Sequence, residues 1–429
     1  MTERVISLSS ISAMAMAATD PQLPKIDPSI WATYKSLFWS VYAPGFLMSL
    51  CQGSVILIIP LFALDLGASA AITALVFSLR GLGNMTVDIP AGWATGKFGD
   101  KTVMLLSVGL MAVSALVASQ ANTTWQLGLA AFAFGAAVAS WLLARLTHVS
   151  EAVPTHQRGK AISTMAGVQR FGNLIGPATS GIVAQIYGFE VVFYGIAVVA
   201  TTALLLVMFA VKVNNRSDPD EHGSILTMAP TILMAHRRVF ATAGFAIWCL
   251  TILRATRSLM LPVWGNAIGL DTSTIGFVVS LSAAIDMLMF PLAGIIMDTW
   301  GRRPAAISCL SIMSVGMLML PFTDSFFSMA IAGLVAGAGN GLGSGINMTL
   351  GSDFAPEGRR GEFLGVWRLL SDTGSMIGPM AVGATATWIT LSSAFYLSAG
   401  VGGLGVIIMW FLVDETLTKR PKQALSKHG

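Results

Sequence analysis

Nine charged side chains interrupt the long apolar runs of this chain, and their types indicate what chemistry it can support. They are six arginines and three aspartates: Arg80, Asp88, Arg145, Arg170, Arg254, Arg257, Asp286, Arg368 and Asp372. A buried carboxyl group can bind and release protons, because burial favours its neutral form while a neighbouring arginine favours its ionised form. The excess of arginine favours an anionic or carboxylate-bearing ligand. We therefore expect proton exchange and anion binding along these runs.

Spacing sorts these residues further. Arg80, Asn84 and Asp88 recur every four residues, so a helix would place them on one face. Arg368 and Asp372 are also four residues apart and could neutralise each other. Arg145 lies near the end of its apolar run, from which a long side chain can reach the interface. The candidates for a substrate and proton pathway are Asp286, Arg254, Arg257, Arg80, Arg170, Asp88, Asp372 and Asn84.

Protons, if they are carried, are expected on Asp88, Asp286 and Asp372. No glutamate lies in the middle of an apolar run, and all five histidines fall in stretches that are expected to be loops or tail. The three cysteines lie inside apolar runs, which argues against disulfide bonds. Neither a metal nor any other cofactor is expected, and a proton gradient would be the driving force.

The composition explains why charge in the apolar runs is informative. The 429 residues are 54% hydrophobic and 11% charged, with a mean hydropathy of +0.73, whereas a soluble domain has about 25% charged residues. Lipid is therefore the expected solvent, and the chain is predicted to be an all-α membrane protein. A charged side chain at a bilayer centre costs about 2.5–3.5 kcal/mol on insertion scales, so it normally faces a cavity or a partner.

Twelve apolar runs have about the 20 residues that cross the hydrocarbon core. They cover approximately residues 42–64, 71–95, 103–119, 125–147, 161–186, 191–213, 239–264, 274–297, 304–320, 326–350, 363–387 and 394–413. Of the 25 lysines and arginines, 19 fall in the terminal segments, in alternate loops or at the edge of a run beside such a loop. The positive-inside rule then predicts cytoplasmic termini, in a plasma membrane or a bacterial inner membrane. Anionic lipid beside these loops accounts for the net charge of +4 without a nucleic-acid partner.

The chain repeats itself at an offset of 202 residues, which pairs Pro60 with Pro262 and Gly67 with Gly269. The repeat predicts two six-helix halves that are related by duplication. The expected segments are an N-terminal arm (1–41), a first half (42–213), a cytoplasmic linker (214–238), a second half (239–413) and a cytoplasmic tail (414–429). Parallel repeats with a site between them near the midplane are typical of secondary transporters.

Three repeated motifs carry a family resemblance. The loop motif "GWATGKFGDK" at 92–101 has the twin "GIIMDTWGRR" at 294–303. The helix motif "GNLIGPATSG" at 172–181 has the twin "GSMIGPMAVG" at 374–383. The segment "PTHQRGK" at 154–160 has the twin "PEGRRGE" at 356–362. In these residues the chain resembles the major facilitator superfamily, over essentially all of its length after the first 35 or so residues.

The resemblance implies a twelve-helix carrier that moves a small solute by alternating access. The helix motif is similar to the Gly-Pro motif of proton-coupled drug and metabolite exporters, which implies efflux by antiport. Glycines let helices touch closely, and proline loosens a helix that must bend. The motif residues are Gly172, Gly176, Pro177, Gly181, Gly374, Gly378, Pro379 and Gly383. The chain departs from these exporters in the fourth span, where Ala131 replaces their arginine.

The loop motif implies a conformational latch. In the family, its acid caps the start of a helix in the opposite half and holds the cytoplasmic side shut. Asp298 would then cap the helix that begins near Lys160, while Gly96 replaces the acid in the first copy. The positive charge of Lys160 opposes the helix dipole, whereas Glu362, at the equivalent position of the second half, complements it. An acid supplied by the opposite half would therefore stabilise only the helix that begins near Lys160. The latch candidates are Asp298, Lys160, Gly294, Gly301, Arg302, Gly92 and Gly99.

Other functions stay open at this point. A membrane enzyme would need a nucleophile with a base, a metal cluster or a phosphate loop, and "GWATGK" is one residue short of the phosphate-loop spacing. The glycine run "GAGNGLGSG" at 337–345 is interpreted as packing within one helix. A non-transporting sensor is a remote alternative, and proton-coupled import of an organic anion is the alternative direction. The expected partners are a small-molecule substrate, protons and the lipid bilayer, and the carrier is expected to act as a monomer.

Overall fold

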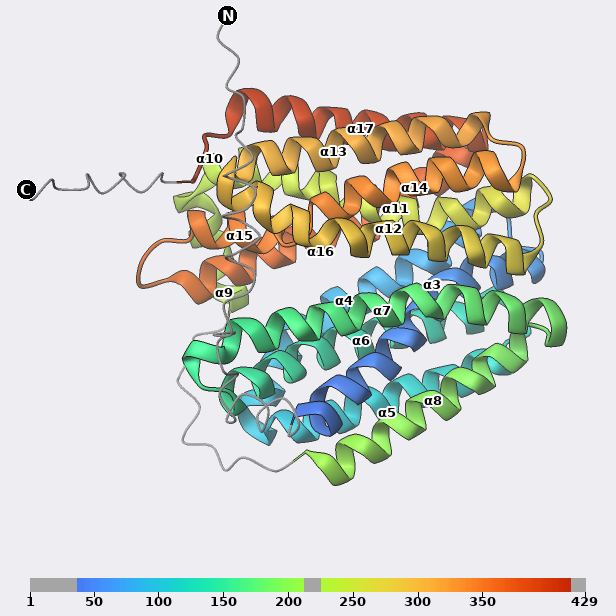
Figure 1. Cartoon of the computed structure of the whole chain (residues 1–429), viewed down its shortest axis with the longest axis horizontal. Coiled ribbons are helices and arrows are strands. Elements are labelled where there is room, and N and C mark those ends of the chain that lie inside the picture. Colours follow the sequence, from blue (N-terminus) through green and yellow to red (C-terminus); the bar gives the residue numbers. More distant parts are fainter. Residues whose placement is uncertain (1–36, 212–224, 418–429) are drawn as a thin grey trace, which may run out of the picture.

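The computed structural model describes residues 37–211 and 225–417, and within them the chain forms helices and no strands (Figure 1). The first half consists of a π-helical turn (Phe38–Tyr42), α3 (Ala43–Asp65), α4 (Ala70–Phe98), α5 (Asp100–Ser119), α6 (Thr124–Ala152), α7 (Thr155–Tyr187) and α8 (Phe189–Ala210). The second half consists of a π-helical turn (Phe240–Gly244), α11 (Phe245–Ala267), α12 (Thr272–Thr299), α13 (Arg302–Met319), α14 (Phe326–Leu342), α15 (Ile346–Phe354), α16 (Arg360–Trp388) and α17 (Leu391–Leu412). The predicted all-α architecture is confirmed.

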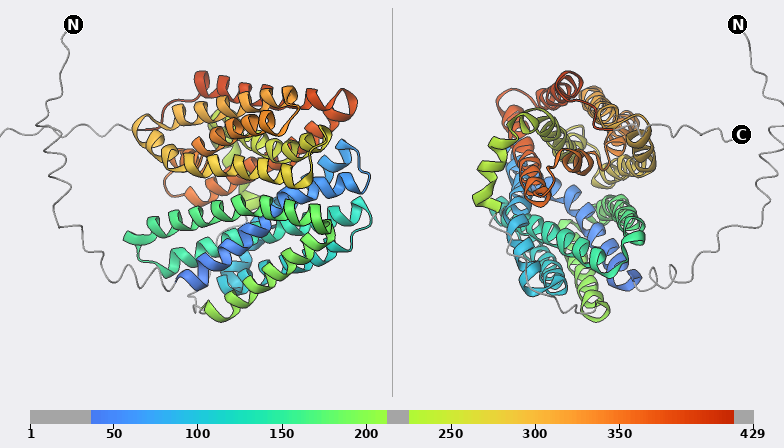
Figure 2. Two further views of the ribbon diagram at one scale, coloured as in Figure 1. Left: turned by 45° about the vertical axis from the view of Figure 1, so that its right-hand side comes forward. Right: turned by 90° about the vertical axis from the view of Figure 1, so that its left-hand side faces the viewer.

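Each half has an apolar core of its own. One cluster of buried residues contains Phe77, Met104 and Phe134 of the first half, and another contains Leu310, Phe363 and Phe395 of the second half. The right-hand view of Figure 2 shows the two groups of helices one above the other. The first cluster extends to three residues of α11 and α12, so the two cores meet where the halves are in contact.

The duplication is visible in the backbone. The π-helical turns at 38–42 and 240–244 stand at the offset of 202 residues. Gly67 and Gly269 both have a φ of 79°, and the loop glycines Gly99 and Gly301 also have positive φ. These glycines end helices in a conformation that side chains with a Cβ rarely adopt. The pseudo-symmetric halves expected from the sequence are therefore present.

Ten of the described helical segments are long and apolar enough to cross a membrane. The two other long helices, α7 and α16, contain the Gly-Pro motifs and several charged residues, and their mean hydropathy is lower for that reason. Both are as long as their neighbours and pack beside them, α7 against α3 and α12, and α16 against α4 and α11. The lower hydropathy is expected for helices that face a partner or a pathway instead of lipid.

The two ends of the helix bundle differ in charge. We call "basic end" the end with the connections at 99, 153–154, 300–301 and 355–359, which the positive-inside rule predicts to be cytoplasmic. The basic residues in these connections and in the adjoining helix ends are Lys97, Lys101, Arg158, Lys160, Arg302, Arg303, Arg359 and Arg360. The connections at the opposite end, 66–69, 120–123, 188, 268–271, 323–325 and 389–390, contain no lysine or arginine.

The halves touch most closely towards the opposite end. There the Thr272 amide donates a 3.0 Å hydrogen bond to Gln185, and the Ala178 amide donates a 2.9 Å hydrogen bond to Ser280. A Cβ built at Gly181 of α7 would lie 2.9 Å from the Thr272 carbonyl oxygen. A Cβ built at Gly96 or Gly294, near the basic end, would meet nothing within 4 Å. The structure therefore represents a state in which the halves meet at the opposite end.

Three sequence-based expectations need correction. The span at 326–350 is two helices, because Gly343–Gly345 form a turn and Gly345 has a φ of 82°. The predicted polar linker contains an apolar helix, α9 (Ile225–Ala235), which packs on α16, followed by the short α10 (Arg237–Val239). The predicted tail begins with a docked segment, since Glu415 contacts α13. The arm up to residue 36, the linker at 212–224 and the tail from residue 418 lie outside the described residues, so the predicted side of both termini stays a prediction.

Candidate functional site

Asp286 lies halfway along α12, at the contact between the halves. Its Oδ1 accepts a 2.6 Å hydrogen bond from Nη1 of Arg170, which α7 of the first half supplies. Its Oδ2 accepts a 2.7 Å hydrogen bond from the amide of Asn340 on α14. The side chains of Arg170 and Asp286 are 23% and 15% exposed, so water or a solute can reach the pair. One ion pair therefore ties α7 to the second half at mid-depth.

Arg170 makes further contacts with the second half. Its Nη2 donates a 2.7 Å hydrogen bond to the Ser344 hydroxyl, in the turn between α14 and α15. Its guanidinium carbon lies 4.7 Å from the centre of the Phe290 ring on α12. Arg170 of the first half thus contacts two elements of the second half, α12 and the turn between α14 and α15.

The turn between α14 and α15 also binds Arg254 of α11. The Gly343 carbonyl oxygen accepts a 2.9 Å hydrogen bond from Nη2 of Arg254. The same carbonyl oxygen accepts a 3.2 Å hydrogen bond from the Ile346 amide, so the turn lets it serve the backbone and Arg254 together. Broken helices of this kind provide ligand groups in many membrane carriers.

Arg257, one turn further along α11, completes a positive cluster. Its Nη1 donates a 2.7 Å hydrogen bond to the Ser282 hydroxyl, and it interacts electrostatically with Asp286 and Arg254. The Nε atoms of Arg254 and Arg257 are buried without a hydrogen-bond partner in the described structure. Three guanidinium groups therefore stand near one carboxylate, and two of them retain a free donor.

A second ion pair crosses between the halves on α4 and α16. Nη2 of Arg368 lies 2.7 Å from Oδ1 of Asp88, and its Nε lies 3.5 Å from Oδ2 of Asp372. The expected pair of Arg368 and Asp372 within one helix is present, and Arg368 in addition pairs with Asp88 of the other half. The shorter contact of Arg368 is with the other half, and the two carboxylates share one cation.

The predicted polar stripe on α4 is present and incompletely satisfied. Arg80, Asn84 and Asp88 each have one buried atom, Nε, Oδ1 and Oδ2 respectively, with no hydrogen-bond partner in the described structure. The guanidinium of Arg80 lies 4.9 Å from the centre of the Phe77 ring and makes no ion pair with a described residue. Unpaired buried polar atoms are rare in folded proteins, so this face is suited to water or a solute.

Arg145 does not reach the interface as the sequence suggested. It is 1% exposed, and its Nη2 donates a 2.9 Å hydrogen bond to Gln169 of α7. The prediction failed because a position near a helix end does not reveal whether neighbouring helices cover it.

The latch residues are apart in this conformation. Asp298 is 79% exposed and lies 3.7 Å from Arg302 of the same loop motif, and Lys160 is exposed, so the contact between Asp298 and Lys160 is not formed. The helix α7 begins at Thr155, five residues before the predicted start near Lys160, so Lys160 lies in its second turn. Gly92 lies near Leu143 alone, and Gly99 and Gly301 shape the loops with positive φ. Gly96 and Gly294 have open space around them near the basic end, so the latch stays a prediction about another conformation.

Both loop motifs are anchored by acids that sequence reasoning did not assign. Glu415 accepts hydrogen bonds of 2.9 and 3.0 Å from the amides of Arg302 and Arg303, so it caps the start of α13. At the repeat-related position of Arg302 stands Asp100, which is buried and lies 2.6 Å from Nδ1 of His148 on α6. His148 was expected in a loop, and the structure corrects this.

The Gly-Pro motifs position α7 and α16. A Cβ at Gly172 or Gly176 would lie 2.6 Å from atoms of α3, and one at Gly374 or Gly378 would lie 3.0–3.2 Å from atoms of α11. Pro177 and Pro379 lie inside their helices. The first glycines of each motif therefore pack within a half. The last glycines, Gly181 and Gly383, pack against α12 and α4 across the halves.

Comparison with known proteins agrees with this architecture. The chain matches the family model of the Major Facilitator Superfamily over residues 43–254 and again over residues 243–428. The chain belongs to the major facilitator superfamily. It is accordingly a multi-pass membrane transporter and not an enzyme.

Individual members of the superfamily are similar at low identity. An MFS-type transporter of Methanocaldococcus jannaschii is 20% identical over 87% of this chain and 95% of its own length. The multidrug resistance protein MdtG of Salmonella choleraesuis is 23% identical over 79% of this chain and 84% of its own length. The solved structure of the nucleoside transporter NupG superposes with a TM-score of 0.73 at 15% identity, covering 88% of this chain and 100% of NupG.

Several site residues of this superfamily member were not found from its sequence. Asn340, Ser344 and Ser282 are neutral residues in glycine- or alanine-rich segments, and such residues are common in membrane helices for packing alone. The available signal was the repeat, because Asp286 and Asn84 occupy equivalent positions. Within the described residues, no group of three His, Cys, Asp or Glu side chains is placed to hold a metal ion.

Proposed function

We propose that this transporter exports a small organic solute with an anionic group in exchange for protons. The proposal rests on one observation, the 2.6 Å pair between Arg170 and Asp286 that joins the two halves beside two further arginines. No cofactor is needed, since a proton gradient would supply the energy. A single chain would suffice, because both ion pairs between the halves lie within it.

Proton coupling follows from how Asp286 is held. A carboxylate that pairs with an arginine can lose this partner when a proton binds, because the neutral acid no longer attracts the guanidinium. Release of Arg170 would then loosen the contact between α7 and α12. Substrate would act on the other partner, since an anion that binds Arg170 competes with Asp286 for the same donors.

An anionic group is favoured by the balance of charge. Arg170, Arg254 and Arg257 stand near the single carboxylate of Asp286, and two of these arginines have an unpaired Nε. A solute carboxylate or phosphate can satisfy such donors at once. Arg80 offers another unpaired donor on the α4 stripe of the first half.

The outward direction of transport is supported by two weaker observations. The Gly-Pro motif resembles that of exporters, and MdtG, which is similar over most of the chain, is named a multidrug resistance protein. We further propose a plasma membrane or bacterial inner membrane location with the basic end in the cytoplasm, as the positive-inside rule predicts.

Inside-out vesicles test this function through Asp286→Asn. Proton-driven uptake of substrate into these vesicles, which corresponds to export, should fall to background, while the folded protein is retained because asparagine preserves the shape. Asp271→Asn is the matched control, since Asp271 is exposed and makes no capping hydrogen bond. Normal proton-driven flux in Asp286→Asn would contradict the proposal, and flux in the reverse direction would show proton-coupled import instead.

A further inference from the structure

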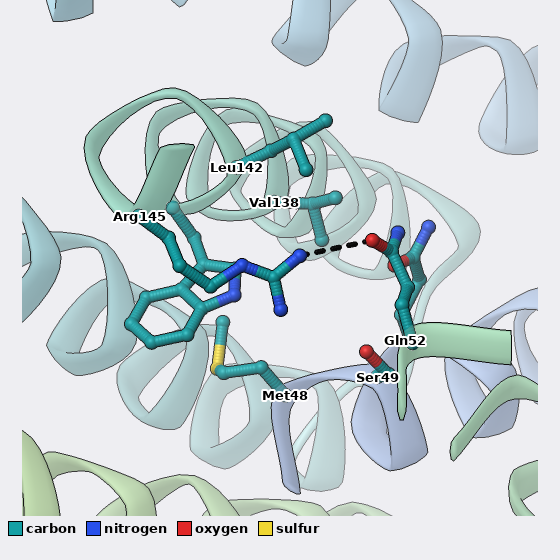
Figure 3. A pocket seen from close by; sticks show the side chains of 8 residues that line it. Met48, Ser49, Gln52, Val138, Leu142 and Arg145 are labelled. Carbon is teal, nitrogen blue, oxygen red and sulfur yellow. Dashed lines mark hydrogen bonds between the residues drawn. The ribbon is translucent and has the colours of Figure 1, made fainter. Parts of the chain in front are cut away.

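A separate polar pocket lies inside the first half, away from the ion pairs that join the halves. Side chains of α3, α6 and α7 enclose a cavity of about 10 Å³ (Figure 3). Its polar lining consists of Ser49, Gln52, Trp141, Arg145 and Gln169. A cavity of this size holds about one water-sized particle.

Two buried donors at this pocket have no acceptor. Arg145 is 1% exposed, and it uses Nη2 to donate to Gln169, but its Nε has no partner in the described structure. The indole Nε1 of Trp141, which lines the same pocket, is also buried and unpaired. Both groups can only donate. Both donor atoms are therefore left without an acceptor among the described residues.

The pocket also lacks negative charge. The described partners of the Arg145 guanidinium are neutral, namely the Gln169 amide and the Trp141 ring at 5.6 Å. The Ser49 hydroxyl donates 2.7 Å to the Gly45 carbonyl oxygen, so it does not supply a charge either. A buried cation is normally paired, because burial of an unpaired charge is costly.

The second half shows how the same positions are satisfied without a ligand. At the offset of 202 residues, Arg254, Gly343 and Asn347 correspond to Gln52, Trp141 and Arg145. Arg254 donates to the carbonyl of Gly343 in the turn between α14 and α15, and Asn347 donates 2.9 Å to Ser371. In the first half, α6 runs unbroken through Trp141, so no such turn carbonyl is present. The position of the neutral Asn347 is taken by the charged Arg145, which therefore needs a partner that the second half does not need.

We propose that this pocket binds one monatomic anion of chloride size as the counter-ion of Arg145. A halide accepts hydrogen bonds from Nε of Arg145 and Nε1 of Trp141 and neutralises the guanidinium. Met48 lines the cavity, and its flexible thioether can move to admit an ion slightly larger than water. The cavity is too small for a carboxylate-bearing solute. Bound anion would hold Gln169, and thereby α7, next to Arg170.

Bromide provides the direct test. Crystals of the whole protein grown in bromide should show an anomalous peak within hydrogen-bond distance of Arg145 and Trp141. An ordered water at this position, or bromide found elsewhere only, would overturn the proposal.

Solution measurements test the same site without crystals. The unfolding temperature of the purified protein should rise when chloride replaces gluconate at constant ionic strength, because a ligand of the folded state stabilises it.

Arg145→Gln should abolish this rise, and the matched control Arg237→Gln, which removes an exposed arginine outside the pocket, should keep it. Trp141→Phe removes one neutral donor and should raise the half-saturating chloride concentration about tenfold. This variant keeps the test decisive if Arg145→Gln does not fold. Equal stability of the wild-type protein in chloride and gluconate would overturn the proposal.

Discussion

At the scale of single residues, the charged side chains differ in how completely they are satisfied. Both carboxylate oxygens of Asp286 are bound, by Arg170 and Asn340. Asp88 shares Arg368 with Asp372 and keeps one buried oxygen unpaired. Arg80 pairs with no described carboxylate. A charged side chain whose hydrogen-bonding atoms all have partners is suited to stabilising one conformation. A charged side chain with an unpaired donor or acceptor atom is suited to binding a solute.

Arg80 should therefore affect binding more than stability. We expect Arg80→Gln to raise the dissociation constant of an anionic substrate about tenfold or more, which corresponds to the loss of one hydrogen bond to a charged group. A neutral substrate analogue should bind as before, and the unfolding temperature should change little, since no ion pair is lost. Equilibrium binding to the purified protein measures both. Equal losses for anionic and neutral ligands would assign Arg80 a structural role.

At the scale of the elements, glycines decide which helix surfaces can meet. Gly276 of α12 and Gly181 of α7 face each other near the opposite end, where a Cβ on Gly276 would lie 2.5 Å from the Pro177 carbonyl oxygen. Gly294, on the same helix near the basic end, has open space around it. The helix α12 is thus closely packed around Gly276 and has open space around Gly294.

This difference predicts opposite outcomes for two alanine substitutions on α12. Gly276→Ala should disfavour the present state by about 1–3 kcal/mol, because the added methyl group meets backbone that cannot move cheaply. The carrier should shift towards a state that is open at the opposite end. Labelling of Asn84→Cys by an impermeant thiol reagent, in a background without the three native cysteines, should then become faster from that side. Gly294→Ala should leave labelling unchanged, and the same acceleration in both variants would refute the argument.

At the scale of the whole molecule, the structure represents one of the states that alternating access requires. The halves are in contact at the opposite end, whereas Gly96 and Gly294 near the basic end have open space around them and Asp298 is exposed there. An interaction that exists in only one state shifts the population towards that state. The latch of Asp298 on Lys160 and the amides of α7 would therefore favour the state that is closed at the basic end.

Removal of the latch should increase access from the basic end. Asp298→Asn loses little in the present state, because an exposed pair with Arg302 contributes under about 1 kcal/mol. It should accelerate labelling of Asn84→Cys from the basic side by a few-fold, whereas Glu357→Gln, which removes another exposed acid at the same end, should not. Glu362→Gln combined with Gly96→Asp should restore slow labelling by building a latch on the other side. Unchanged labelling and transport in Asp298→Asn would show that the latch does not operate.

The sequence by itself determined the solvent, the all-α architecture and the duplication. Apolar length and composition specify membrane helices, and the offset of 202 residues relates Gly67 to Gly269 and one π-helical turn to the other. It also identified Arg170, Asp286, Asp88 and Arg368 as charges that need partners, because an ionised side chain is costly in lipid at any position.

Only the tertiary structure decided which partners these charges have. Arg170 meets Asp286 and Arg368 meets Asp88 across the halves, at separations of 116 and 280 residues. Helical spacing favoured Asp372 for Arg368, since local neighbours are all that a sequence pattern can show. The turn at Gly343–Gly345 and the covered position of Arg145 likewise depend on how helices pack. Charged side chains in the membrane interior pair with the opposite charge that lies nearest in space. The distances between the halves are set only when the two halves pack together.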